Sequence, residues 1–256
     1  MSYLSVSMNQ LIQAVKRAGK SLIRDFNEIE KLQSSVRSRR DFVMSAVSRV
    51  DNILKTDLGK AHPDYPFYVA GKPEPTGPYY VVSNLDGVIN FAHALPQFAI
   101  SAAICQKGTV LAGVVYNPVG DELYFAEKGN GAYKEGFRNQ ERLRVSAVKE
   151  LPEALFAAMP SASVLPAEAG QVRVLGAAGL DLAYVASGRV DVAVSLGNDV
   201  ENIAAGILLV KEAGGYVYDR HQKDIRTEDL AAVLRSGNLV AVNANLSAKV
   251  YNLLNQ

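Results

Sequence analysis

The fold is decided by the stretch Tyr80-Val81-Val82-Ser83-Asn84-Leu85-Asp86-Gly87-Val88-Ile89-Asn90-Phe91. Its first residues are apolar, and they predict a strand that runs into a tight Asp-Gly turn. A strand that ends in such a turn places a polar side chain at the mouth of a sheet. We therefore expect any chemistry of this chain to be centred on Asp86.

Two motifs carry a resemblance to a known family. The stretch around Asp86 resembles a signature of the inositol monophosphatase family, in which a strand ends in Asp-Pro-Ile/Leu-Asp-Gly-Thr and a Thr/Ser-Asn-Phe run follows. The matching positions are Asp86, Gly87, Asn90 and Phe91. Residues 201–206 read Glu-Asn-Ile-Ala-Ala-Gly and are similar to the family's Trp-Asp-x-Ala-Ala-Gly, with its trailing Glu-Ala-Gly-Gly at residues 212–215. On these motifs the chain is identified as a member of the family, over about residues 41–219.

The resemblance implies a fold, an activity and an assembly. The fold would be a layered α-β-α-β-α sandwich of the inositol monophosphatase and fructose-1,6-bisphosphatase type, of mixed α+β and α/β class. The activity would be magnesium-dependent hydrolysis of inositol-1-phosphate or a related sugar phosphate, in a superfamily of lithium-sensitive type. The assembly would be a homodimer.

The resemblance also assigns positions in the site. The five acidic metal ligands of the family fall on Val47, Ala70, Ser83, Asp86 and Asn202. A further ligand is the backbone carbonyl of Leu85, which does not depend on its side chain. Val88 stands at the Thr that orients the attacking water, Asn202 at the Asp that activates it, and Ser195 at a Glu that contacts the inositol ring.

The residues at these positions predict a poor metal site. Mg²⁺ is held by hard oxygen ligands, and two-metal hydrolysis of a phosphate ester needs several of them. The single carboxylate of Asp86 should hold magnesium weakly or not at all. The replacements can still serve the fold, because Asn202 is a good N-cap for a helix that begins at Ile203. The first hypothesis is therefore a catalytically impaired or inactive homologue, a pseudoenzyme, with a binding or regulatory role.

One binding capacity is expected to survive. If a helix starts just after Asp86, the backbone amides of Gly87, Val88 and Ile89 point at an anion site that needs no side chain. We expect weak binding of phosphate or a phospho-sugar there. A protein partner is also expected, although the sequence does not say which.

Two other hypotheses stay open. In the first, the chain is an active Mg²⁺-dependent phosphatase whose ligands have moved, with Asp86, Glu74, Glu201 or Asp199 regrouped around one ion. In the second, it is a nucleic-acid-associated regulator, which would rest on a basic face at residues 16–24 and on an arginine cluster at residues 37–40. Its 27 basic and 26 acidic residues make nucleic-acid binding the less favoured hypothesis.

Composition and hydrophobic pattern predict the core, the helices and the surroundings of the protein. With 256 residues and 48% hydrophobic content it can bury a large core, and we expect an N-terminal half, 1–145, and a C-terminal half, 146–256, packed as one unit. Helices are predicted over 9–26 and over 41–58, the second with Asp41 as N-cap. The only cysteine, Cys105, is expected in the core. No apolar run is long enough to span a bilayer, so we expect a soluble cytoplasmic protein without membrane contact.

Overall fold

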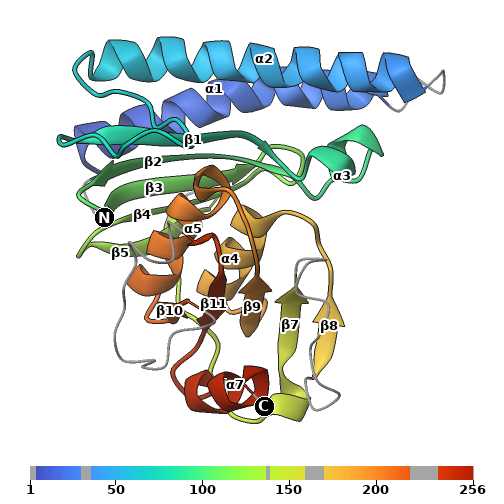
Figure 1. The fold of residues 1–256 in the computed structure, drawn as a ribbon, viewed down its shortest axis with the longest axis vertical. Coiled ribbons are helices and arrows are strands. Elements are labelled where there is room, and N and C mark those ends of the chain that lie inside the picture. The colour runs from blue at the N-terminus through green and yellow to red at the C-terminus, as the bar shows by residue number, and fades with distance from the viewer. Residues whose placement is uncertain (1–3, 30–35, 137–138, 159–169, 220–235, 256) are drawn as a thin grey trace.

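The computed structural model describes residues 4–29, 36–136, 139–158, 170–219 and 236–255, and these form five stacked layers (Figure 1). Two long helices lie over a first sheet, shorter helices separate this sheet from a second one, and a last helix covers the far side. The described helices are α1 (Val6–Ile29), α2 (Val36–Ala61), α3 (Val88–Ala92), α4 (Ala178–Ala186), α5 (Val200–Glu212) and α7 (Ser247–Leu254), with a 3₁₀ turn at Leu151–Glu153. The α-β-α-β-α sandwich predicted from the sequence is confirmed.

The first sheet is an antiparallel meander in chain order. Its described strands are β1 (Tyr79–Asp86), β2 (Ala99–Gln106), β3 (Thr109–Asn117), β4 (Glu122–Glu127), β5 (Gly131–Glu135) and β6 (Gln140–Arg142). Helices cover both of its faces, so β2 is buried almost throughout and reads as a continuous apolar run rather than an alternating one. Cys105 lies in this run and is buried, as predicted.

The second sheet is mixed. Its described strands run in the order β10 (Tyr216–Tyr218), β11 (Leu239–Val242), β9 (Val192–Ser195), β7 (Leu155–Ala158) and β8 (Gln171–Arg173). Strand β7 is parallel to both β8 and β9, whereas β11 is antiparallel to its neighbours. Helices α4 and α5 therefore lie between two sheets of different kinds.

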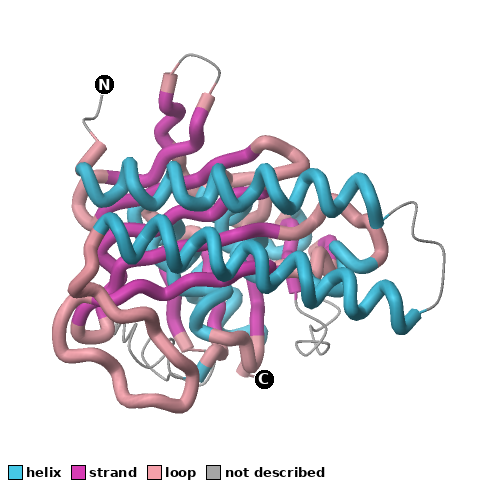
Figure 2. Tube along the Cα trace, turned by 90° about the horizontal axis from the view of Figure 1, so that it is seen from above, coloured by secondary structure: helices cyan, strands magenta, loops and turns pink. Residues whose placement is uncertain are grey.

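The two long helices pack side by side over the first sheet (Figure 2). In α1 the buried residues recur at helical spacing, as the sequence predicted for residues 9–26. The prediction that Asp41 caps the second helix is wrong, because α2 already begins at Val36 and Asp41 lies exposed within it. Arginine has a high helix propensity, which agrees with a helix that includes the arginines before Asp41. Among the described helices, none has an apolar stretch that could cross a membrane.

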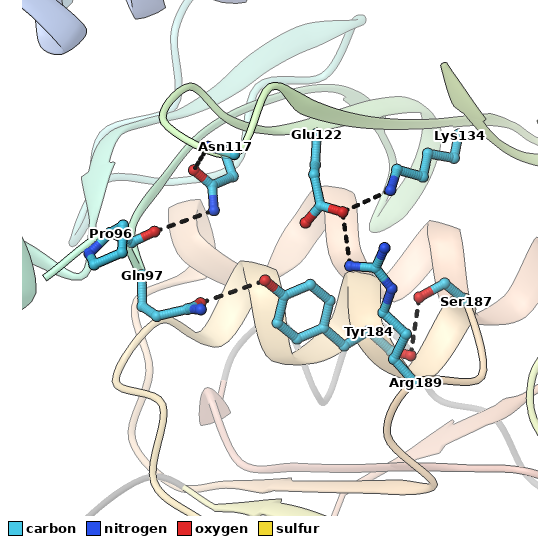
Figure 3. A network of polar contacts seen from close by, with 9 residues as sticks. Pro96, Gln97, Asn117, Glu122, Lys134, Tyr184, Ser187 and Arg189 are labelled. Carbon is cyan, nitrogen blue, oxygen red and sulfur yellow. Dashed lines mark hydrogen bonds and ion pairs between the residues drawn. The ribbon is translucent and has the colours of Figure 1, made fainter. Parts of the chain in front are cut away.

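A polar network fixes the end of α4 on the first sheet (Figure 3). The carboxylate of Glu122 on β4 accepts hydrogen bonds from Lys134 Nζ at 2.6 Å and pairs with Arg189 Nη1 at 2.7 Å. On α4 itself, the Tyr184 hydroxyl donates to Gln97 Oε1 at 3.3 Å. These contacts hold the C-terminal end of α4 over the first sheet.

Candidate functional site

The end of β1 lies close to the first turns of α4 and α5. The pairing of β1 with β2 shifts register between Ser83 and Asp86, which is an irregularity that re-aims side chains at a strand end. Gly87 follows with φ +86°, a left-handed conformation that glycine adopts without strain, and α3 begins directly after it. A Cβ at Gly87 would lie 2.7 Å from a backbone carbonyl oxygen.

The carboxylate of Asp86 turns into the protein. Its side chain is buried, and Oδ2 accepts a hydrogen bond from the backbone amide of Gly179 at 2.7 Å. The amides of Ala178 and Gly87 are also directed at this carboxylate. Burial raises the pKa of Asp86 to about 7, although the three amides act to lower it. Asp86 therefore serves as an acceptor for the first amides of α4, whose own N-cap, Ala177, has no side-chain acceptor.

The absence of a side chain at Gly179 leaves space for the carboxylate of Asp86. A Cβ built on Gly179 would lie 3.1 Å from Asp86 Oδ2 and 3.0 Å from the carbonyl oxygen of Asn202. Both approaches are closer than nearly all real Cβ contacts. Gly179 is thus packed closely between the end of β1 and the start of α5, and a side chain there would require its neighbours to shift by a few tenths of an ångström.

Ser83 and Asn202 bond directly to each other. Ser83 Oγ donates to Asn202 Oδ1 at 2.6 Å, which joins β1 to α5. A second bond between the same layers runs from Ser101 Oγ to the carbonyl of Glu201 at 3.1 Å. The prediction that Asn202 is the N-cap is wrong, because α5 begins at Val200 and its N-cap is Asp199. Asp and Asn are equally good N-caps, so the sequence alone could not separate them.

The other predicted ligand positions carry no charged group. Val47 lies on α2 and packs against the hydrophobic cluster beneath the two long helices. Ala70 is exposed in a turn. The side chain of Leu85 is buried in the same cluster as Val47, and a ligand role for its carbonyl stays a prediction. Ser195 ends β9 and is buried, and its Oγ accepts a hydrogen bond from Asn198 Nδ2.

Of the acids proposed as relocated ligands, Asp199 and Glu201 lie at the start of α5 beside Asn202, and Glu74 lies elsewhere. Glu74 Oε1 accepts hydrogen bonds from the Tyr79 hydroxyl at 3.0 Å and from the Gly108 amide at 2.6 Å. Tyr79 opens β1 and Asp86 ends it, so at about 3.3 Å per residue the two ends are roughly 20 Å apart. Burial, followed by the charges of Glu201, Asp199 and Glu74, raises the pKa of Tyr68.

Two further acids lie near the end of β1 and were not predicted from the sequence. Asp181 on α4 is buried, its Oδ1 has no hydrogen-bond partner among the described residues, and burial together with the charge of Asp86 raises its pKa to about 8. Asp51 on α2 accepts a hydrogen bond from Asn84 Nδ2 at 3.0 Å and pairs with Lys55. For Asp51, the sequence offered one indication: it lies four residues, about one helical turn, after the predicted ligand position Val47. Within the described ranges, no three His, Cys, Asp or Glu side chains are grouped so that they could hold a metal ion.

The predicted anion site lies at the start of a short helix. Helix α3 has five residues, and the side chains of Val88 and Ile89 in its first turn are exposed. The amide of Gly87 faces the carboxylate of Asp86. One of the three predicted donors therefore already has an acceptor within the protein.

Comparisons with known proteins agree with this architecture. The model of the inositol monophosphatase family matches residues 4–256. An inositol-1-monophosphatase of Mesorhizobium japonicum is 40% identical over 232 residues, covering 84% of this chain and 86% of that protein. The Nus factor SuhB of Escherichia coli is 32% identical over 229 residues, covering 83% of this chain and 84% of that protein.

A solved structure is similar over the whole fold. The extragenic suppressor protein suhB from Bartonella henselae superposes with a TM-score of 0.83 at 35% sequence identity. The match covers 99% of this chain and 100% of that one. The likeness thus extends to the N-terminal helices and to the second sheet.

Proposed function

Since this chain belongs to the inositol monophosphatase family, we propose that it has kept the family fold and lost magnesium-dependent hydrolysis, and that it acts by binding. The observation that carries the proposal is the orientation of Asp86, the one acid left among the five carried-over positions. Its carboxylate accepts hydrogen bonds from amides of α4, and the residue is 4% exposed. A carboxylate in that position has its oxygens turned away from solvent and from any phosphate ester.

We infer that the residues present do not fit a magnesium site. The hard cation needs about six oxygen ligands in near-octahedral order, usually with one or two carboxylates. The side-chain oxygens of Ser83 and Asn202 are neutral and hydrogen-bonded to each other, and the side chains of Val47 and Ala70 contain no oxygen. The acids around Tyr68 act on it through space, and Glu74 among them is bonded at the opposite end of β1. The position of Glu74 speaks against its part in the relocated-ligand hypothesis, whereas Asp199 and Glu201 flank Asn202 at the start of α5.

The test pairs metal binding with turnover. Isothermal calorimetry with MgCl₂ should give no heat of specific binding below about 10 mM, and inositol-1-phosphate should release no phosphate above the buffer rate. A family enzyme that is active under the same conditions serves as the positive control. Turnover that Asp86→Asn abolishes would refute the proposal and restore the hypothesis of moved ligands.

For the ligand, we propose weak binding of phosphate or a phospho-sugar at the amides of Val88 and Ile89. Support comes from the position of these residues at the first turn of α3, directly after the left-handed Gly87. The test is an NMR titration with phosphate, in which these two amides should shift and the amides of α7 should not. Unchanged amide shifts at 100 mM phosphate would exclude the site.

For the assembly, we propose a homodimer through an apolar surface made by Ile89, Leu95 and Val174, which are 72%, 52% and 60% exposed. The segments that carry these residues lie side by side, because Asn90 Nδ2 donates to the carbonyl of Leu175 at 2.8 Å and the Leu95 amide donates to the carbonyl of Asn90 at 2.8 Å. Exposed apolar residues that lie together mark interaction sites more often than isolated ones.

A charge placed in this surface tests the dimer. Ile89→Asp with Val174→Asp should shift the mass measured by light scattering from dimer to monomer. Val6→Asp is the control, because Val6 is equally exposed and begins α1, and this end of α1 lies far from α3 in Figure 1. A wild-type protein that elutes as a monomer at 50 μM would exclude the interface. A protein partner and a cytoplasmic location remain predictions from the sequence.

A further inference from the structure

The contact between Asp86 and Gly179 joins the two halves of the chain at the position where the family ligands would converge. Asp86 ends β1 in the first half, and Gly179 lies in the first turn of α4 in the second half. The bond from the Gly179 amide to Asp86 Oδ2 is 2.7 Å long and buried. The hydrogen bond between Ser83 and Asn202 is a second connection, from β1 to α5.

We propose that Gly179 is the residue that keeps Asp86 out of a metal site: the absence of a side chain there lets the carboxylate bind α4 instead of a cation. The inference rests on the proposed function and deepens it, since it names the determinant of the missing metal affinity. Missing carboxylates alone would then not explain the lost site. Restoring them would leave Asp86 turned inward.

Steric crowding at position 179 decides which group has to move. An alanine Cβ there would meet Asp86 Oδ2 at 3.1 Å and the carbonyl oxygen of Asn202 at 3.0 Å. The carbonyl belongs to the backbone of α5, which is packed between the sheets. The carboxylate can rotate about its own side-chain bonds. A methyl group at position 179 therefore displaces the carboxylate of Asp86 first.

A stability experiment tests the contact without any metal. Gly179→Ala should lower the thermal midpoint by several degrees, although alanine favours helices over glycine. Gly59→Ala is the matched control, since Gly59 lies in α2 and a Cβ added there would have nothing within 4 Å, and it should raise the midpoint or leave it unchanged. If Gly179→Ala is as stable as Gly59→Ala, the inference is wrong.

A double-mutant cycle separates the contact with Asp86 from the contact with Asn202. Asp86→Ala should lower the midpoint and speed amide exchange in residues 178–181 at least tenfold, whereas Asp86→Asn, which keeps an acceptor oxygen, should lose less than half as much. In the variant Gly179→Ala/Asp86→Ala the loss should be clearly smaller than the sum of the single losses, because the displaced carboxylate is gone. Additive losses would overturn the inference.

Metal binding provides the second arm. We compare Ser83→Asp/Asn202→Asp with the same variant carrying Gly179→Ala, by calorimetry with MgCl₂ and by the midpoint shift in 10 mM MgCl₂. The triple variant should bind magnesium at least tenfold more tightly than the double variant. Equal affinities would overturn the inference. Magnesium binding by the wild-type protein would instead overturn the proposed function, so the two failures are distinguishable.

Discussion

Replacing Asp181 by asparagine should stabilise the protein, and by an amount that depends on pH. Asp181 is 3% exposed, and its Oδ1 has no partner among the described residues. Burial and the charge of Asp86 raise its pKa from 3.8 to about 8. At neutral pH the folded protein must therefore keep a proton on Asp181 that the unfolded chain releases.

The sign and size of the effect follow from proton linkage. The folded state binds the proton more tightly, so the free energy of unfolding is unaffected by this group below about pH 4 and falls as pH rises toward 8. Each pH unit in that window costs about 1.4 kcal/mol, which amounts to about 4 kcal/mol at pH 7. Asparagine has the same shape and does not titrate. The gain of Asp181→Asn should thus grow from near zero at pH 4 to a few kcal/mol at pH 7.

The assay is urea denaturation of wild type and variant at half-unit steps from pH 4 to pH 8. Asp191→Asn serves as the control, because Asp191 is also buried but accepts a hydrogen bond from the Leu155 amide at 2.6 Å. Its replacement weakens this hydrogen bond and should lower the free energy of unfolding at pH 7. A constant difference between wild type and Asp181→Asn across the range would refute the reasoning, and so would a loss of stability at pH 7.

Three further expectations concern other parts of the fold. Glu122→Gln should lower the free energy of unfolding, measured by urea denaturation, by about 1–3 kcal/mol. Burial acts to raise the pKa of Glu122, but hydrogen bonds from Lys134 and Arg189 lower it overall. The stability that the wild type has over the variant should therefore be lost as pH falls through the lowered pKa. Burial raises the pKa of Cys105 to about 12, so Ellman's reagent should not react with it at pH 8 until the protein is unfolded, and reaction within seconds in buffer would contradict its burial. Gly87→Ala should lower the thermal midpoint by about 5 °C or more because it forces a Cβ against a carbonyl oxygen at positive φ, and an unchanged midpoint would show that the turn can adapt.

The layers of the fold were predicted from the resemblance to the family, and local patterns predicted single elements within them. The apolar run into Asp86-Gly87 predicted β1 and its turn, and helical spacing predicted α1. Helix starts were predicted less well, since Asp41 and Asn202 are both good caps that lie inside helices. A cap residue is necessary for many helix starts but does not by itself stop a helix from beginning earlier.

The sequence predicted which residue types occupy the site but not how their side chains are oriented. Position by position, the sequence indicated that Val47, Ala70, Ser83 and Asn202 are neutral. It could not indicate that Asp86 turns inward, because its acceptor role depends on α4, which lies 93 positions further along the chain at Gly179. For the same reason Asp181 was missed. Within the sequence it is one polar residue in an apolar helix, and its nearness to Asp86 arises only when the two halves pack.

The direct bonds between β1 and the helices behind it have a bearing on the conditions under which the protein keeps its shape. The junction joins a glycine amide to a carboxylate and a serine hydroxyl to an asparagine oxygen, and under the proposed function these bonds hold it without an ion. Chelators added during purification, or a fall in divalent ions inside a starving cell, would leave such a junction intact.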